Sequence, residues 1–174
     1  GFIYFTDPPY GLPQMKQGKE LAFNGVYRVK PNGKDLELLI DDIDMPNGIA
    51  FSPDEKHLYV TDSMHKFINI YALDSEGRPK GMKRFANLDI GQDGTADGIK
   101  VDTDGRVYST GPGGIWVFAT SDKLEAGKLL GKILLPEIPA NCAWGEDGST
   151  LFITARTGLY KIRLAVMGTP VGPR

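Results

Sequence analysis

The stretch PNGIAFSPDEKHLYVTD, residues 46–62, occurs in three related versions along this chain. The second version is ADGIKVDTDGRVYSTG at 96–111, and the third is PANCAWGEDGSTLFITA at 139–155. In each version an apolar triplet is followed by a turn and then by a second strand-like segment. The segment IYFTD at 3–7 matches the end of a version, so we expect the chain to begin within a repeat.

The spacing of the repeats predicts a β-propeller. The triplets begin at Ile49, Ile99 and Cys142, which are 50 and 43 residues apart. Short segments rich in Val, Ile, Tyr and Phe alternate with turns throughout, and such a period is typical of a four-stranded propeller blade. We therefore predict an all-β, incomplete propeller of about three and a half blades over 1–164, followed by a disordered tail at 165–174.

The composition excludes several classes of function. The 174 residues carry a formal net charge of -2, which gives no electrostatic reason to expect nucleic acid or a membrane surface as a partner. The single cysteine, Cys142, stands in an apolar triplet and is expected to be a buried structural thiol.

The location of the protein stays open between cytoplasmic and periplasmic or secreted. Open propeller edges make self-association an expectation.

One polar position changes from repeat to repeat. The residue two before each triplet is Asn47, Asp97 and Ala140 in turn. The innermost strand of each propeller blade begins near the central channel, so these positions should form a ring around one axis. Asn-Gly and Asp-Gly are also common turn dipeptides. Each pair here precedes the apolar triplet rather than joining two hairpin strands, which favours an oxygen site for a hard cation such as Ca²⁺.

Six motifs together resemble the SMP-30/gluconolactonase/LRE-like family, over essentially the whole chain. They are TDPPYG at 6–11, MPNGIAFSPDEK at 45–56, LYVTDS at 58–63, ADGIKVD at 96–102, TGPGGIWVF at 110–118 and NCAWGEDGSTLFITA at 141–155. The resemblance implies a six-bladed propeller with one divalent metal ion in its channel. It also implies three metal ligands: a Glu of the first blade, the Asn of PNG and the Asp of DG. The last two fall on Asn47 and Asp97, whereas the Glu and a further NDG motif have no counterpart in this sequence.

The resemblance implies a metal-dependent lactonase that hydrolyses a sugar lactone such as glucono-1,5-lactone. Ca²⁺ is the first choice of metal, with Zn²⁺ and Mg²⁺ as alternatives, and the metal would polarise the carbonyl. Asp97 would be both a metal ligand and the base that accepts a proton from the attacking water. Two other functions stay open: a hydrolase of aryl esters or organophosphates with the same fold, and a non-catalytic propeller that binds a partner protein.

Three further residues are candidates for substrate binding. Asp7 and Asp62 occupy the same position in the repeat, directly after the strand-end Thr. Tyr10 follows a Pro-Pro pair, and its ring could stack on a sugar or simply pack in the turn. We expect all three to lie near the mouth of the channel.

Overall fold

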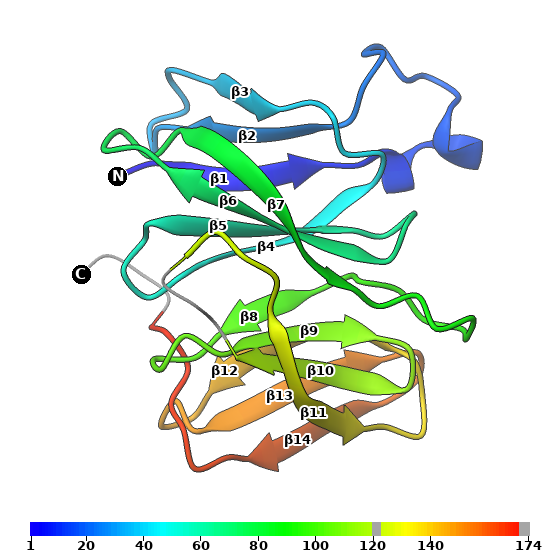
Figure 1. The fold of residues 1–174 in the computed structure, drawn as a ribbon. Coiled ribbons are helices and arrows are strands. Elements are labelled where there is room, and N and C mark those ends of the chain that lie inside the picture. Colours follow the sequence, from blue (N-terminus) through cyan, green and yellow to red (C-terminus); the bar gives the residue numbers. More distant parts are fainter. Residues whose placement is uncertain (120–122, 171–174) are drawn as a thin grey trace.

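The computed structural model describes residues 1–119 and 123–170, and this part of the chain is built almost entirely of antiparallel strands. The strands form four sheets, which we call blades A to D in chain order (Figure 1). Within the described ranges, the only helical elements are two short 3-10 turns, η1 (Pro9–Gly11) and η2 (Pro13–Met15). No described helix has the length and apolar character needed to cross a membrane.

Blades A and B come from the first half of the chain. Blade A contains β1 (Ile3–Asp7), β2 (Gly25–Val29) and β3 (Glu37–Ile40), in that spatial order. Blade B contains β4 (Pro46–Phe51), β5 (His57–Asp62), β6 (Phe67–Leu73) and β7 (Pro79–Asn87), again in chain order. The sequence repeat aligns β1 with β5, and β1 accordingly lies at the edge of blade A that faces β4.

Blades C and D repeat this plan. Blade C contains β8 (Ile99–Val101), β9 (Val107–Gly111), β10 (Gly114–Ala119) and β11 (Lys128–Leu134). Blade D contains β12 (Pro139–Gly145), β13 (Thr150–Ala155) and β14 (Leu159–Arg163). The prediction of an all-β chain with about three and a half blades is confirmed by two four-stranded and two three-stranded sheets.

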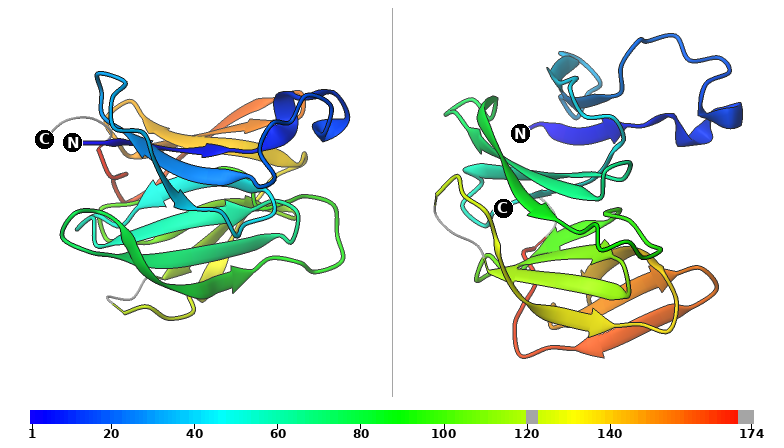
Figure 2. Two further views of the ribbon diagram at one scale, coloured as in Figure 1. Left: turned by 90° about the horizontal axis from the view of Figure 1, so that it is seen from above. Right: turned by 45° about the vertical axis from the view of Figure 1, so that its right-hand side comes forward.

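The innermost strands of successive blades lie side by side. Strand β4 contacts both β1 and β8, and β8 contacts β12, so the blades follow one another around a bend (Figure 2). One backbone hydrogen bond recurs at this inner edge. The N–H of Gly48 donates to the carbonyl oxygen of Asp97 at 2.9 Å, and the N–H of Gly98 donates to that of Ala140 at 3.0 Å. The three positions that vary in the repeat, 47, 97 and 140, therefore lie next to one another along the inner edge of blades B, C and D.

Each pair of neighbouring blades shares an apolar core, because the middle strands bury both of their faces. In β5 all six residues are buried. Successive side chains of a strand point to opposite faces. Leu58 and Val60 therefore pack with Val26 of blade A, whereas Tyr59 packs with Ile99 of blade C. A third cluster, which includes Cys142, joins blades C and D and confirms the expected burial of this thiol.

The expected disordered tail lies partly outside the described residues, which end at 170. Within them, the backbone oxygen of Met167 accepts a hydrogen bond from Thr103 at 2.8 Å, and the N–H of Thr169 donates to Val101 at 3.1 Å. Gly168 forms a bridge with Asp102. This segment lacks strand patterning, yet backbone hydrogen bonds attach it to blade C.

Candidate functional site

Asn47 and Asp97 come together at the inner edge of blades B and C. Asn47 lies in β4, Asp97 lies two residues before β8, and both are half-buried. The backbone N–H of Gly48, next to Asn47, donates to the carbonyl oxygen of Asp97 at 2.9 Å, and the side-chain amide of Asn47 is near enough to lower the pKa of the Asp97 carboxyl. The structure thus places the two predicted metal ligands beside each other, on neighbouring blades.

The side chain of Asn47 and the backbone of Asp97 are held by neighbouring groups. The Nδ2 of Asn47 donates to the Oγ of Ser63 at 3.0 Å, and this Oγ donates to the carbonyl oxygen of Ala96 at 2.8 Å. The backbone of Asp97 is fixed on both sides, because its N–H donates to the Oγ1 of Thr110 at 2.9 Å and its carbonyl accepts from the Oγ1 of Thr61 at 2.8 Å. Such a frame orients the polar side chains before any ligand arrives.

The surroundings of Asp97 raise the pKa of its carboxyl group. Burial raises the pKa of Asp97 above its usual value, because a charged group loses solvation in the protein, and the nearby amide of Asn47 opposes this shift. An aspartate with a raised pKa is a stronger base than an exposed one.

Asp97 lines a cavity of about 400 Å³ between blades C and D. The walls come from the segment before β8, with Asp93 and Thr95, and from blade D, with Pro139, Ala140 and Arg156. A volume of this size is within the range of about 300–1,000 Å³ typical of small-molecule sites. The cavity therefore offers two carboxylates and one guanidinium to a ligand of modest size.

The side-chain oxygens of Asn47 and Asp97 suit part of the coordination shell of a hard cation. The amide oxygen of Asn47 and the carboxylate of Asp97 are oxygen ligands of the kind that Ca²⁺ takes, about six to eight at a time. Among residues 1–119 and 123–170, no group of three or more His, Cys, Asp or Glu is arranged to hold a metal ion. These two residues fit such an ion in chemical type, and its further oxygen ligands would come from other groups.

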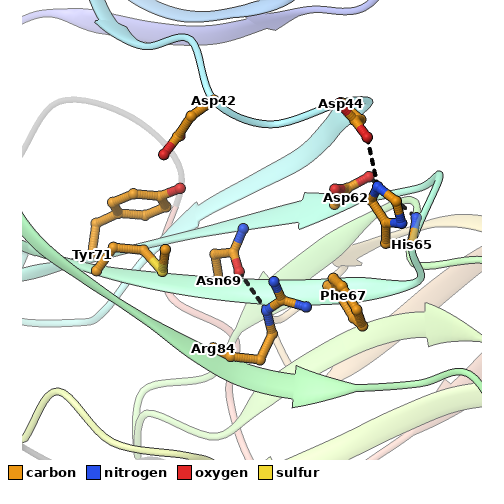
Figure 3. Close-up of a pocket in the computed structure, with 9 residues that line it drawn as sticks. Asp42, Asp44, Asp62, His65, Phe67, Asn69, Tyr71 and Arg84 are labelled. Carbon is orange, nitrogen blue, oxygen red and sulfur yellow. Dashed lines mark hydrogen bonds and ion pairs between the residues drawn. The ribbon is translucent and has the colours of Figure 1, made fainter.

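The three predicted substrate contacts are not brought to this cavity. Asp7 is exposed at the end of β1, and Tyr10 in η1 has 46% of its surface exposed. Asp62 is buried but lines a different cavity, between blade B and the segment that precedes β4 (Figure 3). The alternation of β5 explains this placement: Thr61 faces Asp97, so its neighbour Asp62 faces the opposite side.

Sequence reasoning missed the residues that surround the Asn47–Asp97 pair. Ser63 orients Asn47, and Arg156 lines the cavity with Asp97. The repeat alignment held a usable signal, because Ser63 and Arg156 occupy the same position, two residues after the strand-end Thr. Asp93 stands in a loop outside the aligned segments, and no sequence pattern pointed to it.

Comparisons with known proteins give the family of the chain. The family model described as SMP-30/Gluconolactonase/LRE-like region matches residues 1–157. A gluconolactonase of Zymomonas mobilis is 40% identical over 179 residues, which cover 97% of this chain and 49% of that protein. Lactonase drp35 of Staphylococcus aureus is 31% identical over 141 residues, covering 78% of this chain and 39% of the relative.

Solved structures show the same likeness. A gluconolactonase from Xanthomonas campestris superposes with a TM-score of 0.81 at 37% identity, over 94% of this chain and 54% of that one. A regucalcin from Agrobacterium tumefaciens, described as a calcium-binding protein, gives 0.63 at 25% identity, over 86% and 55% of the two chains. The chain spans about half the length of these relatives. With its repeats, its sheets and its inner-edge contacts, this chain belongs to the SMP-30/gluconolactonase/LRE-like family.

Proposed function

We propose that this chain carries part of the active site of a lactone hydrolase that opens a sugar lactone such as glucono-1,5-lactone with the help of a divalent cation. One observation carries the proposal: Asn47 and Asp97, from adjoining blades, lie next to each other, joined by the Gly48 N–H bond to the Asp97 carbonyl at 2.9 Å, where Asp97 lines a cavity of about 400 Å³. The reaction class is supported by relatives named gluconolactonase and lactonase.

Asp97 would act on the water. Lactone hydrolysis forms a bond between the water oxygen and the carbonyl carbon, breaks the bond from that carbon to the ring oxygen, and moves a proton from water to the ring oxygen. The carboxylate of Asp97 would accept the proton from water and later supply it to the departing ring oxygen. The raised pKa of Asp97 suits this exchange, since the group is a better proton acceptor than an exposed aspartate.

Asn47 and Asp97 would also hold the cation. A divalent ion bound there would polarise the lactone carbonyl and stabilise the negative charge that develops on its oxygen. Asn47 contributes a neutral ligand, which leaves more of the positive charge uncompensated. The calcium-binding description of one structural relative supports Ca²⁺ as the first choice, with Zn²⁺ and Mg²⁺ as alternatives.

Arg156 and Asp93 give the cavity a place for polar substrate groups. Arg156 offers hydrogen-bond donors and Asp93 offers acceptors, and both line the cavity with Asp97. A sugar lactone carries hydroxyl groups that can satisfy both kinds of partner. We therefore assign these residues to binding and orientation of the substrate, and not to proton transfer.

The assay is the hydrolysis of glucono-1,5-lactone by the purified chain, followed by the acid released, first after chelation and then after addition of Ca²⁺, Zn²⁺ or Mg²⁺. We expect a rate above the buffer blank only with a cation present, and a loss of at least about a hundredfold in Asp97→Asn, as for other catalytic bases. Asp35→Asn, an exposed aspartate on another blade, is the control and should keep the full rate. A rate equal to the blank with all three cations, or an Asp97→Asn variant as active as the original, would refute the proposal.

A further inference from the structure

A second cavity lies between blade B and the segment that connects blade A to it (Figure 3). Its volume is about 260 Å³, and its walls come from the end of β5 with the turn that follows it, from β6 and β7, and from the segment 41–45, where Asp44 pairs with His65. It does not include Asn47 or Asp97. Blade B and the segment 41–45 both lie within the described residues.

The hydroxyl of Tyr71 points into this cavity without a partner (Figure 3). The residue has only 4% of its surface exposed, and in the described part of the chain its hydroxyl is the single buried side-chain polar atom that makes no hydrogen bond. Burial, followed by the charge of Asp42, raises the pKa of Tyr71, and the nearby amide of Asn69 opposes this shift without making a hydrogen bond to the hydroxyl. The hydroxyl thus stays protonated and able to donate, and buried polar groups normally have a partner.

Asp62 and Arg84 also line the cavity. Each makes a hydrogen bond within the protein and keeps further acceptor or donor atoms unused. The Oδ1 of Asp62 accepts the backbone N–H of Met64 at 3.0 Å, while its Oδ2 accepts no hydrogen bond from the described residues. The Nε of Arg84 donates to the Oδ1 of Asn69 at 2.9 Å, and its guanidinium lies over the ring of Phe67, 3.3 Å from the centroid. The remaining guanidinium N–H groups of Arg84 are available to a ligand.

The charges of the walls restrict the class of ligand. A metal ion does not suit the cavity, since its carboxylates are not arranged to hold one and Arg84 would repel it. An anion would meet the carboxylates of Asp42, Asp44 and Asp62. A hydroxyl group both donates and accepts, and so it can pair with a carboxylate, a guanidinium or a tyrosine alike.

We propose that this cavity binds a neutral polyhydroxy compound of the size of a monosaccharide, with its hydroxyl groups on Tyr71, Asp62 and Arg84. The volume is close to the lower end of the usual range for small-molecule sites, about 300 Å³, so one sugar ring is the largest ligand expected. The inference does not depend on lactone hydrolysis, because none of these residues takes part in the proposed reaction.

The test is a titration of D-glucose into the ¹⁵N-labelled chain, followed by two-dimensional NMR. We expect saturable shifts of the Arg84 Nε–H, the Asn69 side-chain amide and the backbone amide of Met64. Tyr71→Phe removes only the hydroxyl and should weaken binding about fivefold, as for one hydrogen bond. Tyr27→Phe, a half-buried tyrosine that does not line the cavity, is the matched control and should bind glucose as the original does.

Three results would overturn the proposal. The first is the absence of a saturable shift with D-glucose, D-galactose and glycerol. The second is a Tyr71→Phe variant that binds glucose as tightly as the original chain, with its folded spectrum otherwise preserved. The third is loss of the Arg84 and Asn69 shifts in Asp97→Asn, which would place the sugar in the other cavity. Retention of those shifts in a hydrolytically inactive Asp97→Asn supports the site and separates it from the proposed reaction.

Discussion

Replacing Thr61 with valine tests how adjoining blades are joined. Thr61 is fully buried, and its Oγ1 donates to the Asp97 carbonyl at 2.8 Å and accepts the N–H of Gly48 at 2.7 Å. Valine keeps the shape and loses both bonds. Because the N–H of Gly48 also bonds the Asp97 carbonyl at 2.9 Å, neither backbone group is left unpaired. The expected loss is therefore two ordinary hydrogen bonds, about 2 kcal/mol in the free energy of unfolding.

Urea denaturation followed by tryptophan fluorescence measures this loss, and Thr154 supplies the matched control. Thr154 occupies the same repeat position in blade D, but it is exposed and makes only a 3.4 Å contact with the Asn141 carbonyl. Thr154→Val should change the free energy of unfolding by less than about 0.5 kcal/mol. If Thr61→Val were as stable as the original, or if both substitutions cost the same, the tie between blades B and C would not depend on this hydroxyl.

Two further predictions concern the periphery. The pKa of Glu37 is lowered by hydrogen bonds from Arg78 and then Arg28, so the carboxylate contributes stability above its unfolded pKa and loses it as the pH falls through the folded value. Glu37→Gln should therefore lower the melting temperature at pH 7, with the difference shrinking below about pH 4; a difference that stays constant with pH would contradict this. A Cβ on Gly168 would lie 1.8 Å from the Trp144 ring, so Gly168→Ala should cost about 1–3 kcal/mol and alter the near-ultraviolet circular dichroism. Unchanged spectra and stability would show that the segment after β14 does not pack there.

The fold could be predicted because each repeat carries an apolar triplet at the same position. The triplets at Ile49, Ile99 and Cys142 fall on β4, β8 and β12, the innermost strands of three blades. Each triplet packs at least one side chain, partly or fully buried, against the core between blades, so each blade selects similar residues. The docked segment around Gly168 escaped prediction because backbone hydrogen bonds hold it, and these leave no pattern in residue type.

The site was predictable only at its centre. Asn47 and Asp97 share a repeat position, and the symmetry of the blades carries that position to one inner edge. Asp62 shares a repeat position with Asp7, but the structure turns its side chain toward blade A. Alignment of strand ends locates a residue along a strand, and the alternation of side chains decides its face. Contacts such as that of Ser63 with Asn47 depend on packing between elements, which one sequence does not specify.

The most direct test of a cation site at Asn47 and Asp97 is to locate a bound divalent ion. Mn²⁺, a paramagnetic substitute with a preference for oxygen ligands, can be titrated into the ¹⁵N-labelled chain while amide intensities are followed. We expect the amides of Gly48 and Gly98 to lose intensity first, and Asp97→Asn to remove this selectivity. Early loss confined to other carboxylates, such as Asp42 and Asp44, or equal broadening in the variant, would contradict a cation site formed by Asn47 and Asp97.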